Sequence, residues 1–162
     1  MSEFAIRRAE ISDAAIIASH RARMFRDMGQ VSRTMFEALR ADSEKWLTNG
    51  LRVGEYVGWL ASATDAPDVI IAGAGVQLRR VAPHPNGEGA IAEGRHAVVI
   101  NVFTEPEWRR RGLGELLVRG TMAWAKAQRI DRLVLHASTD GRRLYERLGF
   151  AMTNEMRLSP QS

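Results

Sequence analysis

The fold of this 162-residue chain is decided by Ile100-Asn101-Val102-Phe103-Thr104-Glu105-Pro106-Glu107-Trp108-Arg109-Arg110-Arg111-Gly112-Leu113-Gly114. An apolar, β-favouring run covers residues 98–103, and Pro106 ends it because proline donates no backbone hydrogen bond. Apolar residues then recur at three- and four-residue spacing over residues 115–126, which is typical of an amphipathic helix. The stretch therefore predicts a buried strand, a short loop, a glycine-rich turn and a helix.

The glycine-rich turn before this helix is suited to an anion. The first backbone N–H groups of a helix have no partner inside the helix and carry partial positive charge. Gly112 and Gly114 let a phosphate approach these groups, and a pyrophosphate is the natural guest. Forked cationic donors at the same place come from Arg109, Arg110 and Arg111. Neither the Walker pattern nor the three-glycine dinucleotide fingerprint is present.

Two motifs, in the right order and spacing, resemble those of the GNAT superfamily of N-acetyltransferases. Arg109-x-x-Gly112-x-Gly114 resembles motif A, which reads Gln/Arg-x-x-Gly-x-Gly/Ala. Leu144-Tyr145-Glu146-Arg147-Leu148-Gly149-Phe150 resembles motif B, a tyrosine-bearing helix that runs into a strand. The resemblance implies the GNAT fold, which is α+β: a central, mostly antiparallel split sheet flanked by helices.

The rest of the chain follows the element order of that fold, and we expect one domain over residues 1–162. Hydrophobic period and turn residues predict strands at 4–9, 51–61, 69–79, 133–137 and 150–158, and helices at 12–28, 32–50 and 139–148. Prolines and glycines interrupt residues 81–95, which predicts an irregular loop. Such a loop either reaches over a substrate site or is a surface insertion.

Composition excludes several classes of protein. A hydrophobic fraction of 45% with 26% charged residues is ordinary for a soluble globular protein. No apolar run is long enough to span a bilayer and no signal-peptide core is visible, so we expect a cytoplasmic protein without a membrane partner. The absence of cysteine excludes disulfides, thiol catalysis and cysteine-based zinc sites. The histidines lack ligand spacing, so no metal is expected.

The charge does not indicate a nucleic-acid partner. The sequence pI is 10.3, yet the net charge is only +4. Among 23 basic residues only Lys45 and Lys126 are lysines, and the high pKa of arginine raises the pI without creating a strong field at neutral pH. No basic stripe interleaved with aromatic residues is present.

The resemblance implies acetyl-coenzyme A (acetyl-CoA) as cofactor, with coenzyme A as a product. Matched position by position, backbone groups of Val102, Phe103 and Thr104 contact the pantetheine arm as if it were another strand. The pyrophosphate is held by Arg109, Arg110, Arg111, Gly112, Leu113 and Gly114. Ser138 stands where many relatives carry an asparagine that contacts the cofactor arm, so this contact departs from the family pattern. Tyr145 corresponds to the tyrosine that protonates the departing thiolate, with a packed structural tyrosine as the alternative.

The base that deprotonates the amine is not evident. Many relatives use a glutamate on the central strand, and by our alignment that place falls at or near Val98. The substitutes in this chain are Glu93, His96, Asn101, His20 and Glu105. His96 has the intrinsic pKa best suited to neutral pH, so we predict it to be catalytic together with Tyr145. A structural histidine on a strand is the alternative.

These expectations add up to a cytoplasmic, bacterial-type acyltransferase of the EC 2.3.1 class. It moves an acetyl group from acetyl-CoA directly to a primary amine, of a small molecule or a peptide, in a ternary complex. The alternative is a catalytically weak or inactive coenzyme A sensor or interaction module, motivated by the missing strand glutamate. A homodimer through the final strand or an exposed sheet edge stays open.

Overall fold

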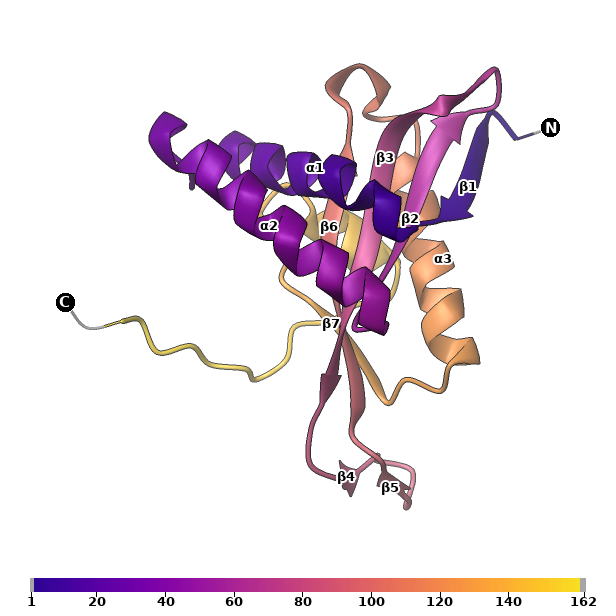
Figure 1. Cartoon of the computed structure of the whole chain (residues 1–162). Coiled ribbons are helices and arrows are strands. Elements are labelled where there is room, and N and C mark those ends of the chain that lie inside the picture. The colour runs from indigo at the N-terminus through magenta and orange to yellow at the C-terminus, as the bar shows by residue number, and fades with distance from the viewer. Residues whose placement is uncertain (1, 161–162) are drawn as a thin grey trace.

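A five-stranded sheet with the order β1-β2-β3-β6-β7 runs through the molecule (Figure 1). Its strands are β1 (Phe4–Arg8), β2 (Tyr56–Ala63), β3 (Ala66–Arg80), β6 (Arg95–Thr104) and β7 (Arg132–Leu135). All neighbours are antiparallel except β6 and β7, which are parallel. The structure is a computed structural model that describes residues 2–160. It confirms the predicted α+β class with a mostly antiparallel sheet flanked by helices.

Helices cover both faces of the sheet. They are α1 (Ala14–Asp27), α2 (Arg33–Val53), α3 (Leu113–Ala127) and the short α4 (Arg142–Arg147), with 3-10 turns η1 (Ile11–Asp13) and η2 (Pro106–Trp108). In Figure 1, α1 and α2 lie together on one face of the sheet and α3 lies on the other. No helix within residues 2–160 is long and apolar enough to cross a membrane.

Each face of the sheet has its own buried cluster, because successive strand residues point to opposite sides. Trp59 of β2 and Leu117 of α3 belong to the cluster on one face. Leu60, the next residue of β2, belongs to the other cluster with Ile17 of α1 and Leu47 of α2. The two layers of helices therefore hold β2, β3 and β6 rigidly between them.

The second helix is longer than the sequence predicted. Its start is confirmed, since the Ser32 hydroxyl accepts a hydrogen bond from the Met35 N–H at 3.3 Å. The predicted end at residue 50 is wrong: Gly50 is buried inside α2, where a Cβ would lie 3.0 Å from the Cβ of Tyr56. The helix ends instead at Gly54, whose left-handed φ of +78° suits glycine. Residues 51–53 are therefore helical, and β2 begins at Tyr56.

The segment at residues 81–95, predicted to be irregular, contains a small hairpin. Its strands are β4 (His84–Pro85) and β5 (Ile91–Ala92), joined through Gly87 and Gly89, which both have positive φ. The Nε2 atoms of His84 and His96 lie 2.8 Å apart and fasten this hairpin to the start of β6. The prediction failed because two-residue strands are too short to produce a periodic pattern.

The predicted final strand at residues 150–158 is also wrong. These residues belong to no helix or strand, have no strand partner among residues 2–160, and leave the body of the molecule (Figure 1). The helix before them, predicted at 139–148, is confined to α4. An alternating sequence becomes a strand only when another strand offers hydrogen bonds, and the chain itself supplies none here.

Candidate active site

The candidate site begins where β6 and β7 part. The two strands pair from His96 opposite Arg132 to Val99 opposite Leu135, where β7 ends. β6 continues to Thr104 with β3 on its other edge. On the side of β7, residues 100–104 therefore have an edge without a strand partner in the described part of the chain. The predicted contacts of Val102, Phe103 and Thr104 fall in this part of the strand, whose free backbone groups suit an extended ligand.

The turn that follows β6 presents backbone N–H groups at the start of α3. Arg110 has a φ of +63° and Gly112 a φ of +82°, both in the left-handed region. Left-handed residues next to right-handed ones aim consecutive N–H groups into a concavity that binds anions. No atom lies within 4 Å of where a Gly112 Cβ would stand, so the glycine is required by conformation and the space before the turn is open.

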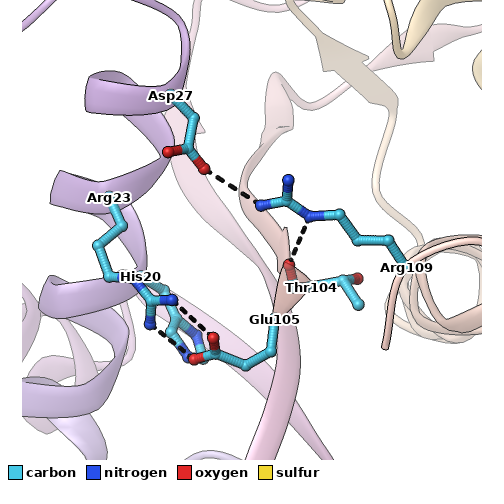
Figure 2. Close-up of polar contacts among 6 residues, drawn as sticks. All are labelled: His20, Arg23, Asp27, Thr104, Glu105 and Arg109. Carbon is cyan, nitrogen blue, oxygen red and sulfur yellow. Dashed lines mark hydrogen bonds and ion pairs between the residues drawn. The ribbon is translucent and has the colours of Figure 1, made fainter. Parts of the chain in front are cut away.

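The side chain of Arg109 holds the turn in place by hydrogen bonds to β6 and α1. Its Nε donates to the Thr104 carbonyl at 3.0 Å, and its second guanidinium nitrogen donates to Asp27 of α1 at 3.1 Å (Figure 2). The Arg109 side chain thus ties the turn to the end of β6 and to the end of α1. The carbonyl of Thr104 is consequently already engaged by the protein.

The other two arginines of the turn differ in their partners. Arg111 lies 3.5 Å from the Glu3 carboxylate and stacks over the Trp108 ring, 4.8 Å from its centroid. Arg110 is exposed and has no hydrogen bond or ion pair within residues 2–160. Of the three predicted cationic contacts, Arg110 is therefore the one with a guanidinium free for a phosphate.

Helix α4, which carries Tyr145, lies against the start of α3. A Cβ on Gly114 would lie 3.7 Å from Leu144, and Arg147 lies 3.7 Å from Glu115 of α3. Tyr145 is half-buried, and its hydroxyl has no hydrogen-bond partner in the described part of the chain. Burial raises the pKa of Tyr145 above its ordinary value of 10, so the phenol stays protonated at neutral pH.

Ser138 has a local role in this arrangement. Its hydroxyl accepts a hydrogen bond from the Gly141 N–H at 3.1 Å, and its carbonyl accepts one from the Arg142 N–H at 3.1 Å. A Cβ on Gly141 would lie 3.1 Å from the Tyr145 ring. Ser138 thus shapes the turn into α4, and Gly141 makes room for the tyrosine.

A partly buried ion pair beside a buried histidine lies at the end of β6 on the side of α1 (Figure 2). Arg23 donates two hydrogen bonds of 2.6 Å to the Glu105 carboxylate, which holds the pKa of Glu105 below its ordinary value. His20 is 1% exposed and stacks on Phe103, with ring centroids 4.6 Å apart. Its Nε2 lies 3.6 Å from Glu105 and has no hydrogen bond. Burial lowers the pKa of His20 to about 4, so the ring is neutral.

A second buried network, which the sequence did not predict, lies at a bulge in β6. Asn101 has a φ of +59° and is 3% exposed. Its amide nitrogen donates to the Tyr56 hydroxyl at 3.3 Å, and its amide oxygen accepts from Arg21 at 2.8 Å. Asn101 was among the candidate bases, but both ends of its amide are committed. In the sequence, the only sign of this network was Asn101, a single amide side chain inside an apolar strand. Nothing pointed to Tyr56 or Arg21 as its partners.

The structure does not bring His96 to this place. His96 begins the paired part of β6, eight residues before Thr104, so about 26 Å of extended strand separates them. Glu93 lies before β6 at the same end of the strand. His96 instead pairs with His84, as described above. The catalytic role of His96 stays a prediction, and the strand places His96 far from Thr104 and the turn that follows.

Comparison with known proteins bears on this geometry. Residues 17–150 match the sequence model of the acetyltransferase (GNAT) family. A mycothiol acetyltransferase from Corynebacterium diphtheriae is 36% identical over 78 residues, which span 46% of this chain and only 26% of that relative. A GCN5-related N-acetyltransferase from Ralstonia eutropha superposes with a TM-score of 0.85 at 28% identity, over 97% of this chain and 98% of the other. A predicted acetyltransferase from Clostridium acetobutylicum, solved with acetyl-CoA, gives 0.81 at 25% identity over 97% and 96%.

Proposed function

The chain belongs to the acetyltransferase (GNAT) family of acyltransferases, which use acetyl-CoA, and from that premise we propose that it acetylates a primary amine. The observation that carries the proposal is the free edge of β6 at residues 100–104, which leads directly into the anion-binding turn at the start of α3. Acetyl-CoA matches this order of groups, because its thioester is joined by a pantetheine arm, which suits the strand edge, to a pyrophosphate, which suits the turn. We further propose that residues 1–162 act as one domain, since one sheet joins β1 to β7.

We assign the proposed cofactor contacts to backbone and side-chain groups that have no partner among the described residues. Backbone groups of Val102 and Phe103 hold the pantetheine arm, while Thr104 contributes less because its carbonyl is taken by Arg109. The N–H groups around Gly112, Leu113 and Gly114 hold the pyrophosphate. Arg110 adds the free guanidinium, whereas Arg109 and Arg111 keep the turn in place.

Tyr145 is the proposed proton donor to the leaving sulfur. When bound, acetyl-CoA would supply a thioester carbonyl open to attack by an amine, with an N–C bond formed, the C–S bond broken and one proton released from the amine. Tyr145 lies on α4, which contacts the start of α3, and burial keeps its phenol protonated at neutral pH, so that a proton is available for the leaving thiolate. The proton that the attacking amine loses then restores the phenol, so the site keeps no anion. In this proposal the acetyl group passes directly from acetyl-CoA to the amine while both are bound in a ternary complex.

The acceptor class that we propose is a small molecule or peptide with a primary amine. Among the candidate bases, Glu105 is held ionised by Arg23 and His20 is buried without access to solvent. An amine attacks only when it is unprotonated. We therefore propose that the amine binds as its neutral form, and that the rate rises with pH up to the pKa of the amine.

The test is an acetyl-transfer assay that follows thiol release with amino sugars, amino acids and short peptides. We expect turnover with at least one of these amines, and we expect Tyr145→Phe to lower kcat by about 100-fold while the Kd for acetyl-CoA stays unchanged. Binding of acetyl-CoA serves as the control that the variant is folded. Tight binding without turnover in the wild type would favour a coenzyme A sensor, and full activity in Tyr145→Phe would remove the tyrosine from the mechanism.

A further inference from the structure

Arg21 is a partly buried arginine that reaches from α1 to β6. Its Nη1 donates to the side-chain oxygen of Asn101 at 2.8 Å, and its guanidinium lies over the ring of Phe25, 4.9 Å from the ring centroid. Asn101 belongs to the part of β6 that continues beyond the end of β7. The guanidinium of Arg21 therefore lies beside the first residues of the strand edge to which the pantetheine arm is assigned.

The positive charge of Arg21 has no negative partner in the described chain. Asn101 is an uncharged amide, and burial raises the pKa of Tyr56 to about 12, so the phenol that binds this amide is neutral as well. Burial lowers the pKa of Arg21 itself, and no carboxylate among residues 2–160 opposes this effect. The guanidinium nevertheless stays charged, because the ordinary pKa of arginine is so high. A partly buried cation without a counter-charge is unfavourable.

A second arginine of α1 has the partner that Arg21 lacks. Arg23 donates two hydrogen bonds of 2.6 Å to the carboxylate of Glu105, and this pairing raises the pKa of Arg23 (Figure 2). Arg21 uses one N–H donor for Asn101, and its other donors have no hydrogen-bond partner within residues 2–160. Among them, Nε and Nη2 form a planar fork that matches the two oxygens of a carboxylate. Arg21 is thus arranged for a carboxylate that these residues do not supply.

The position of Arg21 relates it to the reacting end of the proposed cofactor site. The pyrophosphate is assigned to the turn after β6, so the pantetheine arm follows the strand edge back from Thr104 towards Ile100. Asn101 lies about 10 Å along an extended strand from Thr104. The acetyl end therefore belongs at the part of the edge that carries Asn101. The side chain of Asn101 in turn points to α1 and Arg21.

We propose that Arg21 binds a carboxylate of the amine acceptor, which makes the acceptor an acidic primary amine such as an amino acid. This inference rests on the proposed acetyl transfer and narrows its substrate class. The carboxylate pairs with the Nε and Nη2 fork and supplies the missing counter-charge. The amide of Asn101, which is itself bound to Tyr56, holds the guanidinium in position. Arg21 thus determines which amine binds and takes no part in proton transfer.

The test compares acceptors of similar size that differ in charge, in the assay that follows thiol release. Each of several amino acids is paired with its carboxamide, and kcat and KM are measured separately. We expect the wild type to have a kcat/KM at least about 10-fold higher for the amino acid, because a hydrogen bond between charged groups is lost in the carboxamide. Phosphoethanolamine paired with ethanolamine asks the same question of a phosphate. A preference for the phosphate alone would overturn the assignment to a carboxylate.

Variants of Arg21 show whether this residue causes the preference. Arg21→Gln removes the charge and keeps a donor for Asn101, and we expect it to raise KM for the amino acid by at least about 10-fold. Its kcat, and its KM for the carboxamide, should stay as in the wild type, whereas a merely structural role would affect both acceptors equally. Arg21→Lys restores the charge without the fork and should recover part of the preference. Arg26→Gln, at an exposed position of the same helix, is the matched control.

The possible results separate this inference from the proposed function. Turnover with equal kcat/KM for amino acids and carboxamides would overturn the inference and leave the proposed acetyl transfer intact. A preference that survives in Arg21→Gln would have the same meaning. Absence of turnover with every amine removes the proposed function, and this inference with it. The comparison of acceptors in the wild type needs no variant, so it decides even where Arg21→Gln does not fold.

Discussion

His20 is a neutral histidine held inside the fold, and it makes stability depend on pH. Its pKa is lowered to about 4 in the folded chain, against an ordinary value of 6.5. Between these two pH values His20 binds a proton in the unfolded chain but not in the folded chain. The stabilising effect of the neutral ring is thus complete above about pH 6.5 and is lost as the pH falls towards 4, with a total of about 3 kcal/mol.

The free energy of urea unfolding, measured from pH 7.5 to pH 4, checks this prediction. We expect His20→Leu, which keeps an apolar partner for Phe103, to reduce the slope between pH 6.5 and 4, where burial also lowers the pKa of His96 and leaves a remainder. At pH 7.5 the variant should differ little from the wild type, because the His20 Nε2 has no hydrogen bond to lose. Identical slopes in both proteins would show that His20 does not titrate as described.

Sequence reasoning reached some residues of the candidate site but not their partners. Gly112 and Tyr145 were found because they stand at fixed places in two motifs. The pairs Arg23 with Glu105 and Arg21 with Asn101 join positions about 80 residues apart. No local spacing signals such a contact, because only the packing of α1 across β6 creates it.

Gly75 of β3 lies against the ring of Tyr56 on the neighbouring strand β2, and this position has no room for a side chain. A Cβ on Gly75 would collide with the Tyr56 hydroxyl, which also accepts the hydrogen bond from Asn101. We expect Gly75→Ala to displace the phenol and to destabilise the fold by about 3 kcal/mol. Gly120→Ala is the control on an exposed face of α3, where nothing lies within 4 Å, and it should stabilise by up to about 1 kcal/mol.

Thermal and urea denaturation of the two glycine variants measure this difference. Loss of stability in Gly75→Ala alone would confirm that the contact of β3 with Tyr56 is as close as described. Equal stability of Gly75→Ala and the wild type would contradict it, since it would mean that the phenol has space to move at no cost.

Elements were predicted well where one strong local signal marked them. The Ser32 cap, the apolar run of β6 and the helical period of α3 each did so, and each element is present. The end of α2 was predicted at Gly50, but Gly50 packs on Tyr56 inside the helix, which continues to Gly54. The strand pattern at residues 150–158 was read correctly as a pattern, but a strand also needs an edge to pair with.

At the scale of the whole molecule, the proposed cofactor site combines separate elements. They are the free edge of β6, the helix α4 that carries Tyr145, and the turn of Arg110 and Gly112 before α3. The family resemblance predicted this order, but the distinct roles of the three arginines depend on Asp27 and Glu3, which are remote in sequence. Only the folded chain separates bracing arginines from the free one.

Calorimetric titration with acetyl-CoA tests the central claim most directly. We expect the wild type to bind in the micromolar range and the Arg110→Glu, Gly112→Asp double variant to bind at least about 100-fold more weakly, because it loses the free cation and adds two negative charges at the turn. Arg80→Glu, at the far end of β3, is the control for a charge reversal away from the turn and should bind as the wild type does. A folded wild type that binds no acetyl-CoA, or a folded double variant that binds it equally well, would contradict the account.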